Sequence, residues 1–373
     1  MAQNNLRWVL PKISFLLPVG ISYYTFMAIG YTIDVYNEEI EVEKNIGVLG
    51  LFISFFPLIL SGPIERANNL IPQFRNNILL KPENVKKGLK LMLWGYFMKL
   101  VVADRLAIYI DVVFENLQNH NGNTILLATL LYPIQVYGDL GGYSLLAIGV
   151  AKILGIDVMS NFNRPFFSTS MAEFWRRWHI SLIKWLTDYV YTPLAFSFRS
   201  LKLKGIILAL MVTFILSGLW HEGTINFFIW GVIQGAYLSF EASINTKRIK
   251  LETKYNLKQN ILYVSFFICF TYLLFAFSEV FGRSNSINDS LLAFEKIILD
   301  KGILFLDKTT LTYGLIGASI LLLSDFKAEY FPNKFRTFDS PYITIRWFSY
   351  ITITLLILWI GILNGGQFIY FKF

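Results

Sequence analysis

Two histidines have surroundings that suit proton transfer. His221 lies in a run from residue 205 to residue 240 that has no Lys, Arg or Asp, and Glu222 is the only acidic residue there. An ionisable side chain in an apolar run of membrane length is costly, so its presence favours a function. A buried imidazole stays neutral and accepts a proton from a hydroxyl group. We interpret His221 as a candidate general base for acyl transfer. The structural alternative is a histidine bonded to a backbone carbonyl at a helix break.

The second histidine, His179, follows an aromatic and basic stretch that reads Phe-Trp-Arg-Arg-Trp. From the residues alone, a functional histidine and an interfacial anchor are equally favoured. Arg176 and Arg177 are candidates for binding the phosphates of an acyl donor, because guanidinium groups suit phosphate. Their structural alternative is to hold this segment at the inner membrane surface.

Further candidates for the lining of a site are aromatic or acidic. Asp139 is a carboxylate in an otherwise uncharged span, and it either pairs with Arg176 or Arg177 or lines a cavity. The candidate lining residues are Trp178, Trp220, Asp139 and Glu222. The chain has three widely spaced histidines and one cysteine, Cys269, so we predict no metal site, no disulfide and no bound cofactor.

The composition is that of a membrane protein. Of 373 residues, 55% are hydrophobic and only 16% are charged, against about 25% charged in soluble domains. The net charge of +8 is best interpreted as basic cytoplasmic loops, and no nucleic-acid partner is expected. The sequence therefore predicts an all-α, multi-pass protein surrounded by membrane lipid.

Nine apolar runs are candidate membrane spans, and two of them, 88–114 and 302–324, are interrupted by charged residues. Residues 173–198 are too polar to span, and they suit an interfacial or re-entrant helix. The predicted spans are 13–36, 45–64, 88–114, 124–154, 205–220, 225–244, 260–282, 302–324 and 346–365.

Five clusters of basic residues all lie on one side of the membrane if an even number of spans separates them. They are at 66–90, 152–184, 199–204, 247–258 and 327–346. This places the N-terminus and the clusters in the cytoplasm.

One helix over residues 205–240 would extend about 54 Å, well beyond a hydrocarbon core of about 30 Å. The run must break, and residues 221–224, His-Glu-Gly-Thr, are predicted to form the break away from the cytoplasmic ends. The glycine pairs at 138 and 142 and at 231 and 235 suit close helix packing.

Four blocks together resemble the membrane-bound O-acyltransferase family, in particular its bacterial alginate O-acetylase-like branch. They are residues 17–26 (Leu-Pro-Val-Gly-Ile-Ser-Tyr-Tyr-Thr-Phe), 55–66 (Phe-Phe-Pro-Leu-Ile-Leu-Ser-Gly-Pro-Ile-Glu-Arg), 161–166 (Asn-Phe-Asn-Arg-Pro-Phe) continuing through 173–182, and 217–221 (Ser-Gly-Leu-Trp-His). The Trp-Arg-Arg-Trp-His sequence followed by Gly-Leu-Trp-His carries most of the resemblance.

The resemblance implies a helical bundle around a transmembrane tunnel, with His221 as the principal catalytic residue and His179 assisting. It implies an acyl donor such as acetyl-CoA or an acyl-carrier thioester, and transfer to a cell-surface polysaccharide or to a periplasmic or membrane-anchored acetyltransferase partner of a polysaccharide export machinery. The implied location is the bacterial inner membrane. A teichoic-acid D-alanyl transfer branch of the same family, and a non-catalytic transporter or scaffold, stay open as alternatives.

The chain is expected to form one membrane domain over residues 1–373. It begins almost at the block matching residues 17–26, whereas family members usually have helices before that block. We therefore expect N-terminal helices typical of the family to be missing. Glu222 also departs from the family, in which a small residue often follows the second histidine.

Overall fold

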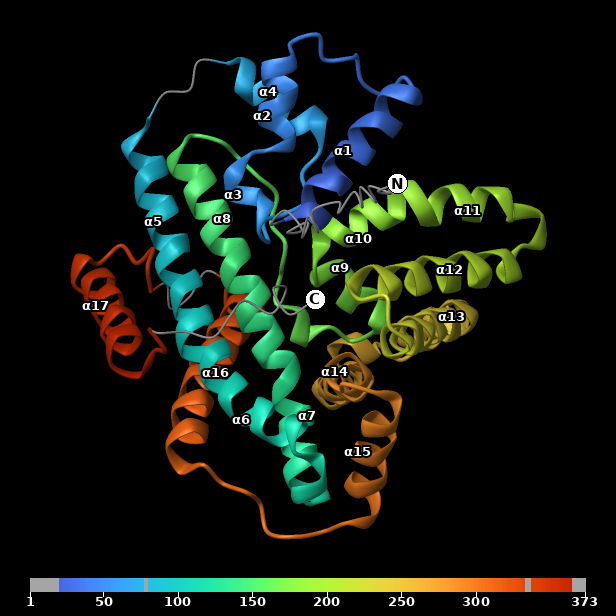
Figure 1. Cartoon of the computed structure of the whole chain (residues 1–373), viewed down its shortest axis with the longest axis vertical. Helices are drawn as coiled ribbons and strands as arrows, with labels where there is room; N and C mark the ends of the chain where they lie inside the picture. The colour runs from blue at the N-terminus through green and yellow to red at the C-terminus, as the bar shows by residue number, and fades with distance from the viewer. Residues whose placement is uncertain (1–19, 77–79, 333–336, 364–373) are drawn as a thin grey trace, which may run out of the picture.

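A computed structural model describes residues 20–76, 80–332 and 337–363, and it is helical without a strand in those ranges (Figure 1). Five helices there are long and apolar enough to cross a membrane. This confirms the predicted all-α, multi-pass architecture. The five are α12 (Leu203–His221), α13 (Ile225–Lys254), α14 (Ile261–Arg283), α16 (Lys308–Tyr330) and α17 (Ile343–Ile360).

Two further long helical segments pack side by side, and each contains a central π-helix. The first joins α5 (Pro82–Tyr96), η1 (Phe97–Ala103) and α6 (Asp104–Glu115), and the second joins α7 (Gly122–Val136), η3 (Tyr137–Gly141) and α8 (Gly142–Ile153). They run antiparallel, with α5 along α8, η1 against η3 and α6 along α7 (Figure 1). Glycines permit this approach, because a Cβ on Gly95 would lie 2.7 Å from the carbonyl oxygen of Gly142.

The N-terminal part consists of shorter helices, namely α1 (Ile21–Tyr36), α2 (Ile46–Ile53), α3 (Phe56–Ile59) and α4 (Ala67–Arg75). The prediction of one span over residues 45–64 is wrong, because the chain leaves helical geometry between α2 and α3 and again after α3. Pro57 lies in the first turn of α3, where its missing N–H is tolerated. Of the predicted span 13–36, residues 13–19 lie outside the described residues.

The polar segment 173–198 forms short helices, as its composition predicts. They are α9 (Met171–Arg177), α10 (Ile180–Leu186), the π-helix η5 (Thr187–Tyr191) and α11 (Thr192–Ser197). Single 3-10 turns precede and follow them at η4 (Pro165–Phe167) and η6 (Arg199–Leu201). The chain bends sharply between α9 and α10 at His179, whose φ of 45° and ψ of 50° are left-handed.

The long apolar run breaks where predicted. α12 ends at His221 and α13 begins at Ile225, and the two helices pack closely along each other. Gly231 allows this contact, since a Cβ there would lie 2.5 Å from the carbonyl oxygen of Phe214. The predicted packing role of the glycine pairs is confirmed, because side chains at Gly138, Gly142 and Gly235 would also crowd a neighbouring helix.

The C-terminal part returns to the long antiparallel helices through α15 (Ile287–Leu299), α16 and α17 (Figure 1). The start predicted for the span 302–324 is wrong, because α16 begins at Lys308. The Asp307 side chain caps this helix by accepting a hydrogen bond of 3.2 Å from the backbone N–H of Thr310. The charges that seemed to interrupt the span therefore lie at its end. Residues 364 and 365 of the last predicted span lie outside the described residues. Two 3-10 turns, η2 (Leu117–Asn119) and η7 (Leu257–Gln259), complete the elements of the described chain.

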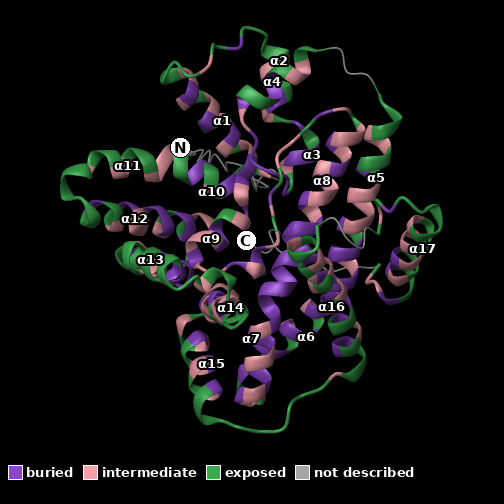
Figure 2. Ribbon diagram, turned by 180° about the vertical axis from the view of Figure 1, so that it is seen from behind, coloured by how far each residue is buried: buried purple, intermediate pink, exposed green. Residues whose placement is uncertain are grey.

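Buried residues gather where α6, α7, α9 and α14 meet, and exposed residues cover the outer helices (Figure 2). On α17, the large apolar side chains Trp347, Phe348 and Trp359 are exposed. Apolar side chains on the outer face of a membrane-length helix suit contact with lipid. The centre of the molecule is thus left for polar and aromatic side chains that surround three cavities.

Candidate functional site

His179 and His221 line the same small cavity, of about 60 Å³, which we call the histidine cavity. Trp178, Trp230 and Glu279 also line it. The two histidines come from different parts of the fold, the α9–α10 bend and the C-terminal end of α12. The structure therefore brings together the two residues that the sequence marks for proton transfer.

Asn161 holds the backbone on the C-terminal side of His179. Its carbonyl oxygen accepts a hydrogen bond of 2.8 Å from the Ile180 N–H, and its Oδ1 accepts from the N–H and the hydroxyl of Ser181 at 3.2 and 2.9 Å. Its Nδ2 donates to the Ser144 hydroxyl of α8 at 3.0 Å. These bonds stabilise a left-handed conformation that is unfavourable for a non-glycine residue. His179 is thereby fixed on the cavity wall.

The His179 imidazole is 2% exposed, and its Nδ1 has no hydrogen-bond partner among the described residues. His179 lies outside the five membrane-length helices. Burial lowers the pKa of His179 to about 3, and repulsion from His221 contributes to the shift. The imidazole is therefore neutral at ordinary pH, with a ring nitrogen available to accept a proton or a hydrogen bond.

His221 is surrounded by aromatic rings. Its ring centroid lies 4.8 Å from that of Trp220, 5.9 Å from that of Phe227 and 5.4 Å from that of Trp230. As the last residue of α12 it also lies at the negative end of a helix dipole, which stabilises a transient positive charge on the imidazole. Both features suit a base that is neutral at rest and protonated during a reaction.

Glu279 is a site residue that the sequence analysis did not identify. It is a buried carboxylate on α14, and its Oε1 accepts a hydrogen bond of 2.9 Å from the Trp230 indole nitrogen. The signal was present, because an acidic residue near the end of the apolar run 260–282 is unusual in a membrane span. Glu279 holds the ring against which His221 packs.

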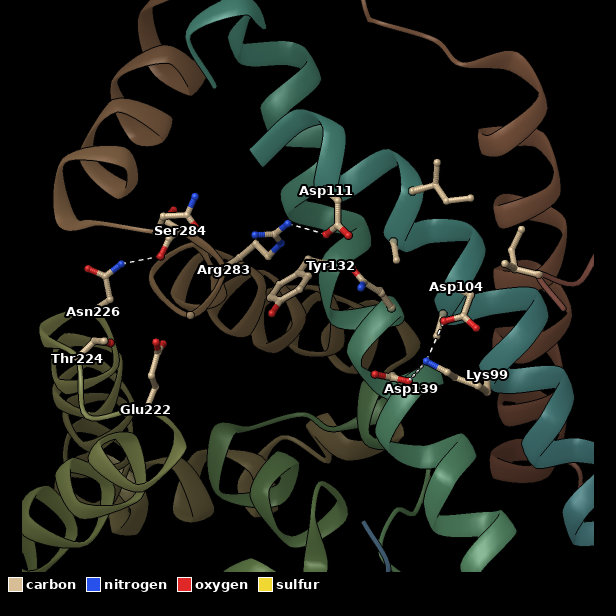
Figure 3. A pocket seen from close by; sticks show the side chains of 17 residues that line it. Lys99, Asp104, Asp111, Tyr132, Asp139, Glu222, Thr224, Asn226, Arg283 and Ser284 are labelled. Carbon is tan, nitrogen blue, oxygen red and sulfur yellow. Dashed lines mark hydrogen bonds and ion pairs between the residues drawn. The ribbon is translucent and has the colours of Figure 1, made fainter. Parts of the chain in front are cut away.

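A second cavity, of about 350 Å³, adjoins the histidine cavity, because Tyr132 and Gly282 line both. We call it the acidic cavity, since four carboxylates and two basic side chains line it (Figure 3). Its charged residues are Lys99, Asp104, Asp111, Asp139, Glu222 and Arg283. Asp139 and Glu222 therefore both line a cavity.

The expected pairing of Asp139 with Arg176 or Arg177 is wrong. Asp139 lies 2.6 Å from the Lys99 ammonium, which also contacts Asp104 at 2.8 Å (Figure 3). Lys99 belongs to η1 and Asp139 to η3, so this ion triad joins the two π-helices. The charges that seemed to interrupt the span 88–114 are paired inside the protein, which is how membrane proteins tolerate them.

The third cavity, of about 870 Å³, is lined by Arg176, Arg177 and Arg248, and we call it the arginine cavity. Arg177 is held by ion pairs to Glu173 at 2.7 Å and Glu329 at 3.0 Å. Burial of Arg177 opposes its charge, but the contacts with Glu329 and Glu173 outweigh burial and raise its pKa. Arg176 is exposed, and it is the better placed of the two predicted phosphate-binding arginines.

The three cavities follow one another along α14. Tyr263 near its start lines the arginine cavity, Phe275 and Glu279 line the histidine cavity, and Arg283 at its end lines the acidic cavity. Tyr263 and Arg283 are twenty residues apart in sequence, which corresponds to about 30 Å along a helix and matches the thickness of a hydrocarbon core. The histidines therefore lie between two cavities at opposite ends of a membrane-length helix.

Trp178 and Trp220 have different positions. Trp178 lines the histidine cavity. Trp220 packs on Phe26 of α1, with ring centroids 5.0 Å apart, and it is absent from the described residues that line the three cavities. The Trp220 ring packs against the His221 ring and so helps to hold the imidazole in position.

One family model and several known proteins match this chain. The model of the membrane-bound O-acyltransferase family matches residues 49–278. The chain is 40% identical over 234 residues to the protein named Probable alginate O-acetylase AlgI of Pseudomonas syringae pv. tomato, covering 62% of this chain and 44% of that protein. It is 32% identical over 265 residues to the peptidoglycan O-acetyltransferase of Helicobacter pylori, covering 63% and 50%.

A more distant relative is the teichoic acid D-alanyltransferase of Bacillus subtilis, 28% identical over 278 residues, covering 71% of this chain and 69% of that protein. The chain spans about half the length of the alginate and peptidoglycan relatives it matches. The family match covers more than half of the chain and includes both histidines. The chain belongs to the membrane-bound O-acyltransferase family.

Proposed function

We propose that this protein is a membrane O-acyltransferase that moves an acetyl group from a cytoplasmic thioester to a hydroxyl group on the other side of the membrane. The observation that carries the proposal is the shared lining of the histidine cavity by His179 and His221, between the arginine and acidic cavities. The names of the relatives, an alginate O-acetylase and a peptidoglycan O-acetyltransferase, support a polysaccharide acceptor.

The distribution of charge supports an orientation for the protein. The basic stretches 199–204 and 247–258 lie at one end of α12 and α13, and the break at residues 222–224 lies at the other. Basic loops face the cytoplasm in bacterial membranes. The arginine cavity then opens toward the cytoplasm and the acidic cavity toward the outside of an inner membrane.

The arginine cavity is the proposed entrance for the donor, acetyl-CoA or an acyl-carrier thioester. Both donors carry phosphate, and Arg176 is the exposed guanidinium in this cavity. Trp175, on the same short helix as Arg176, and Trp178, which follows this helix directly, line the histidine cavity. A donor anchored at Arg176 would therefore reach the histidines along the α9 surface.

The reaction follows from neutral imidazoles in a site that excludes water. His221 takes the proton from the acceptor hydroxyl as the oxygen attacks the thioester carbon. A C–O bond forms, the C–S bond breaks, and the imidazolium returns its proton to the leaving thiolate. The Nδ1 of His179, which has no hydrogen-bond partner among the described residues, is placed to hydrogen-bond a reacting group. The aromatic rings packed against His221 reduce the access of water and so limit hydrolysis of the thioester.

The acceptor that meets the acyl group is either a glycan hydroxyl or a hydroxyl of a periplasmic or membrane-anchored acetyltransferase that completes the transfer. Both present the same reacting group to His221. A partner of that kind would dock on the outer end of the molecule, beside the break at residues 222–224.

The test is acyl transfer by the purified protein in vesicles, with labelled acetyl-CoA or an acetylated carrier as donor and glycan hydroxyls as acceptor. We expect His221→Ala to lower the rate by at least about a hundredfold, the usual contribution of a general base. His120→Ala is the matched control, because His120 packs on Phe305 and lines none of the three cavities. Equal rates for wild type and His221→Ala would refute the proposal.

A further inference from the structure

Glu241 on α13 holds the first turn of α9. Its Oε1 accepts a hydrogen bond of 2.7 Å from the Met171 N–H, and its Oε2 accepts one of 2.9 Å from the Ala172 N–H. The Ser170 hydroxyl accepts the next N–H, that of Glu173, at 3.1 Å. The first N–H groups of a helix have no partner within the helix. Two of these three in α9 are therefore satisfied by one carboxylate from another helix.

The position of α9 depends on such contacts. It has seven residues, and helices shorter than about 12–15 residues are barely stable on their own. A second contact joins it to α13, because the Trp175 indole nitrogen donates a hydrogen bond of 3.2 Å to the Oε1 of Gln234. The Nε2 of this buried glutamine donates to the Ser278 hydroxyl of α14 at 2.7 Å. Gln234 and Glu241 are seven residues apart, about two turns, so one face of α13 holds α9 at two points.

The Arg176 guanidinium takes its position from the α9 backbone. Other basic side chains of the arginine cavity are held by carboxylates: Arg177 and Arg248 form ion pairs, and Lys258 lies 3.5 Å from Glu252. In the part of the chain that the structure describes, Arg176 forms no ion pair, although it lines the same cavity. A shift of α9 would therefore move this guanidinium with it.

Glu241 itself lines the arginine cavity. A carboxylate near a phosphate-binding arginine repels the phosphate, so by charge alone its removal would strengthen phosphate binding. Removal of its hydrogen bonds would instead release the start of α9 and displace Arg176, which would weaken phosphate binding. The two effects have opposite signs, and a binding measurement separates them.

We propose that Glu241 is a positioning residue for the donor: it holds the first turn of α9 and so places the Arg176 guanidinium to receive the phosphate of a phosphopantetheine arm. Coenzyme A and acyl carrier proteins both contain this arm. The inference rests on the proposed function for the identity of the donor, but binding requires no acyl transfer. It makes α13 the helix that places both ends of the donor site, since Trp230 of α13 packs against His221.

The experiment measures equilibrium binding to the full chain in lipid nanodiscs, without any thioester. The probes are phosphopantetheine and pantetheine, which lacks the phosphate. We expect Glu241→Gln to weaken phosphopantetheine binding about tenfold, because a glutamine side chain has one acceptor oxygen for two N–H groups. Pantetheine binding should stay unchanged. Unchanged or tighter binding of phosphopantetheine by the variant, equal losses for the two probes, or no binding of phosphopantetheine by the wild type would overturn the proposal.

A double variant ties the effect to Arg176. Arg176→Gln removes the phosphate contact and is expected to weaken phosphopantetheine binding about tenfold. Because Glu241 acts through Arg176, adding Glu241→Gln to this variant should weaken binding no further. Losses that multiply in the double variant would contradict the positioning role. Glu295→Gln is the matched control, since Glu295 is exposed on α15 and lines none of the three cavities.

A milder variant covers the case in which Glu241→Gln does not fold. Ser170→Ala releases only the Glu173 N–H at the start of α9, and it should weaken phosphopantetheine binding about threefold without changing pantetheine binding. Equal affinities of Ser170→Ala and wild type for phosphopantetheine would then overturn the proposal. A thermal unfolding midpoint for each variant separates lost binding from lost folding.

Coenzyme A and a holo acyl carrier protein identify the source of the arm. Whichever of them binds the wild type should lose affinity for Glu241→Gln as phosphopantetheine does, and a loss with neither would overturn the proposal. The two proposals fail separately. Binding that behaves as expected in a protein without acyl transfer would overturn the proposed function and leave the role of Glu241. Acyl transfer that depends on His221, in a protein whose Glu241→Gln variant binds phosphopantetheine normally, would do the reverse.

Discussion

His221 packs against Trp230, whose indole nitrogen is bonded to Glu279. Trp230 of α13 and Glu279 of α14 thus fix the position of the imidazole at the end of α12. Glu279 is a positioning residue in this arrangement, because its contact with His221 passes through the tryptophan ring. A similar role at the other histidine falls to Asn161, which holds the bend that carries His179.

The Glu279 side chain offers a test at this scale. Glu279→Leu would leave the buried Trp230 N–H without an acceptor, which costs about 1–3 kcal/mol. We expect a lower unfolding midpoint and at least about a tenfold fall in the acyl-transfer rate. Glu279→Gln keeps an acceptor oxygen and should restore much of both. If the glutamine variant were as damaged as the leucine variant, hydrogen bonding to Trp230 would not be the role of Glu279.

At the scale of elements, two short features decide how the site is built. The π-helices η1 and η3 face each other and carry the Lys99–Asp139 ion pair. On α9, Trp175 lines the histidine cavity, whereas Arg176 and Arg177 line the arginine cavity. A π-helix widens the helical turn and displaces side chains, and such segments are frequent at functional sites.

Loss of one member of the ion triad between the π-helices should cost more stability than loss of all three. Lys99→Met would remove the ammonium group that pairs with the buried carboxylates of Asp104 and Asp139, and breaking a buried ion pair in this way costs about 3–5 kcal/mol. We expect a strongly lowered unfolding midpoint or loss of folded protein from the membrane. The triple variant Lys99→Met, Asp104→Asn, Asp139→Asn removes all the charges and should recover most of the stability. Failure of the triple variant to improve on the single one would contradict this account.

The α9 helix should depend on pH through Glu173. This carboxylate accepts hydrogen bonds from Thr169 at 2.9 Å and lies 2.7 Å from Arg177. Burial opposes ionisation of Glu173, but the Thr169 bonds and the Arg177 charge outweigh burial and lower its pKa below the ordinary value of 4.5. The unfolded chain therefore binds more protons as the pH falls through that range, and stability falls with it.

We expect the wild-type protein in detergent to lose about 1 kcal/mol of stability from this group on going from pH 7 to below its lowered pKa. Glu173→Gln should be less stable at pH 7 and less sensitive to acid. Unfolding midpoints measured at several pH values check both points. An equal dependence on pH in the two proteins would show that the Glu173 contacts contribute no stability.

At the scale of the whole molecule, the central question is which end faces which side of the membrane. The break at residues 222–224 and the basic stretch 247–258 lie at opposite ends of α13. The three cavities are ordered along the same direction on α14. One orientation therefore assigns both the donor side and the acceptor side.

Site-directed labelling decides the orientation. Cys269 is exposed on α14, so it is first replaced by serine. Gly223→Cys adds a side chain where no atom lies within 4 Å, and Lys247→Cys is at an exposed position. An impermeant maleimide should label Gly223→Cys in intact cells and Lys247→Cys only after permeabilisation. Labelling of both from the same side, or with the order reversed, would contradict the proposed orientation.

Much of this protein was determined by local sequence. Apolar runs longer than a bilayer must break, so a break within residues 205–240 followed from length, and the polar residues 221–224 indicated its place at the end of α12. The polar segment that became α9 to α11 was excluded as a span by its charges. Two wrong predictions also concern local structure. The predicted span 45–64 overlooks the break before Pro57. Asp307 and Lys308 are predicted to interrupt a span, whereas Asp307 caps α16 and Lys308 begins it.

Only the tertiary structure decided which distant residues meet. Composition marks Lys99, Asp104 and Asp139 as costly charges, but packing of η1 against η3 makes them partners. Two histidines in similar aromatic settings become one site because the bend after α9 and the end of α12 both line the cavity that Phe275 and Glu279 of α14 also line. The free-energy cost of burying a charged group depends on its own side chain, so it is known from the sequence. The partner that offsets it depends on long-range contacts, which only the folded chain provides.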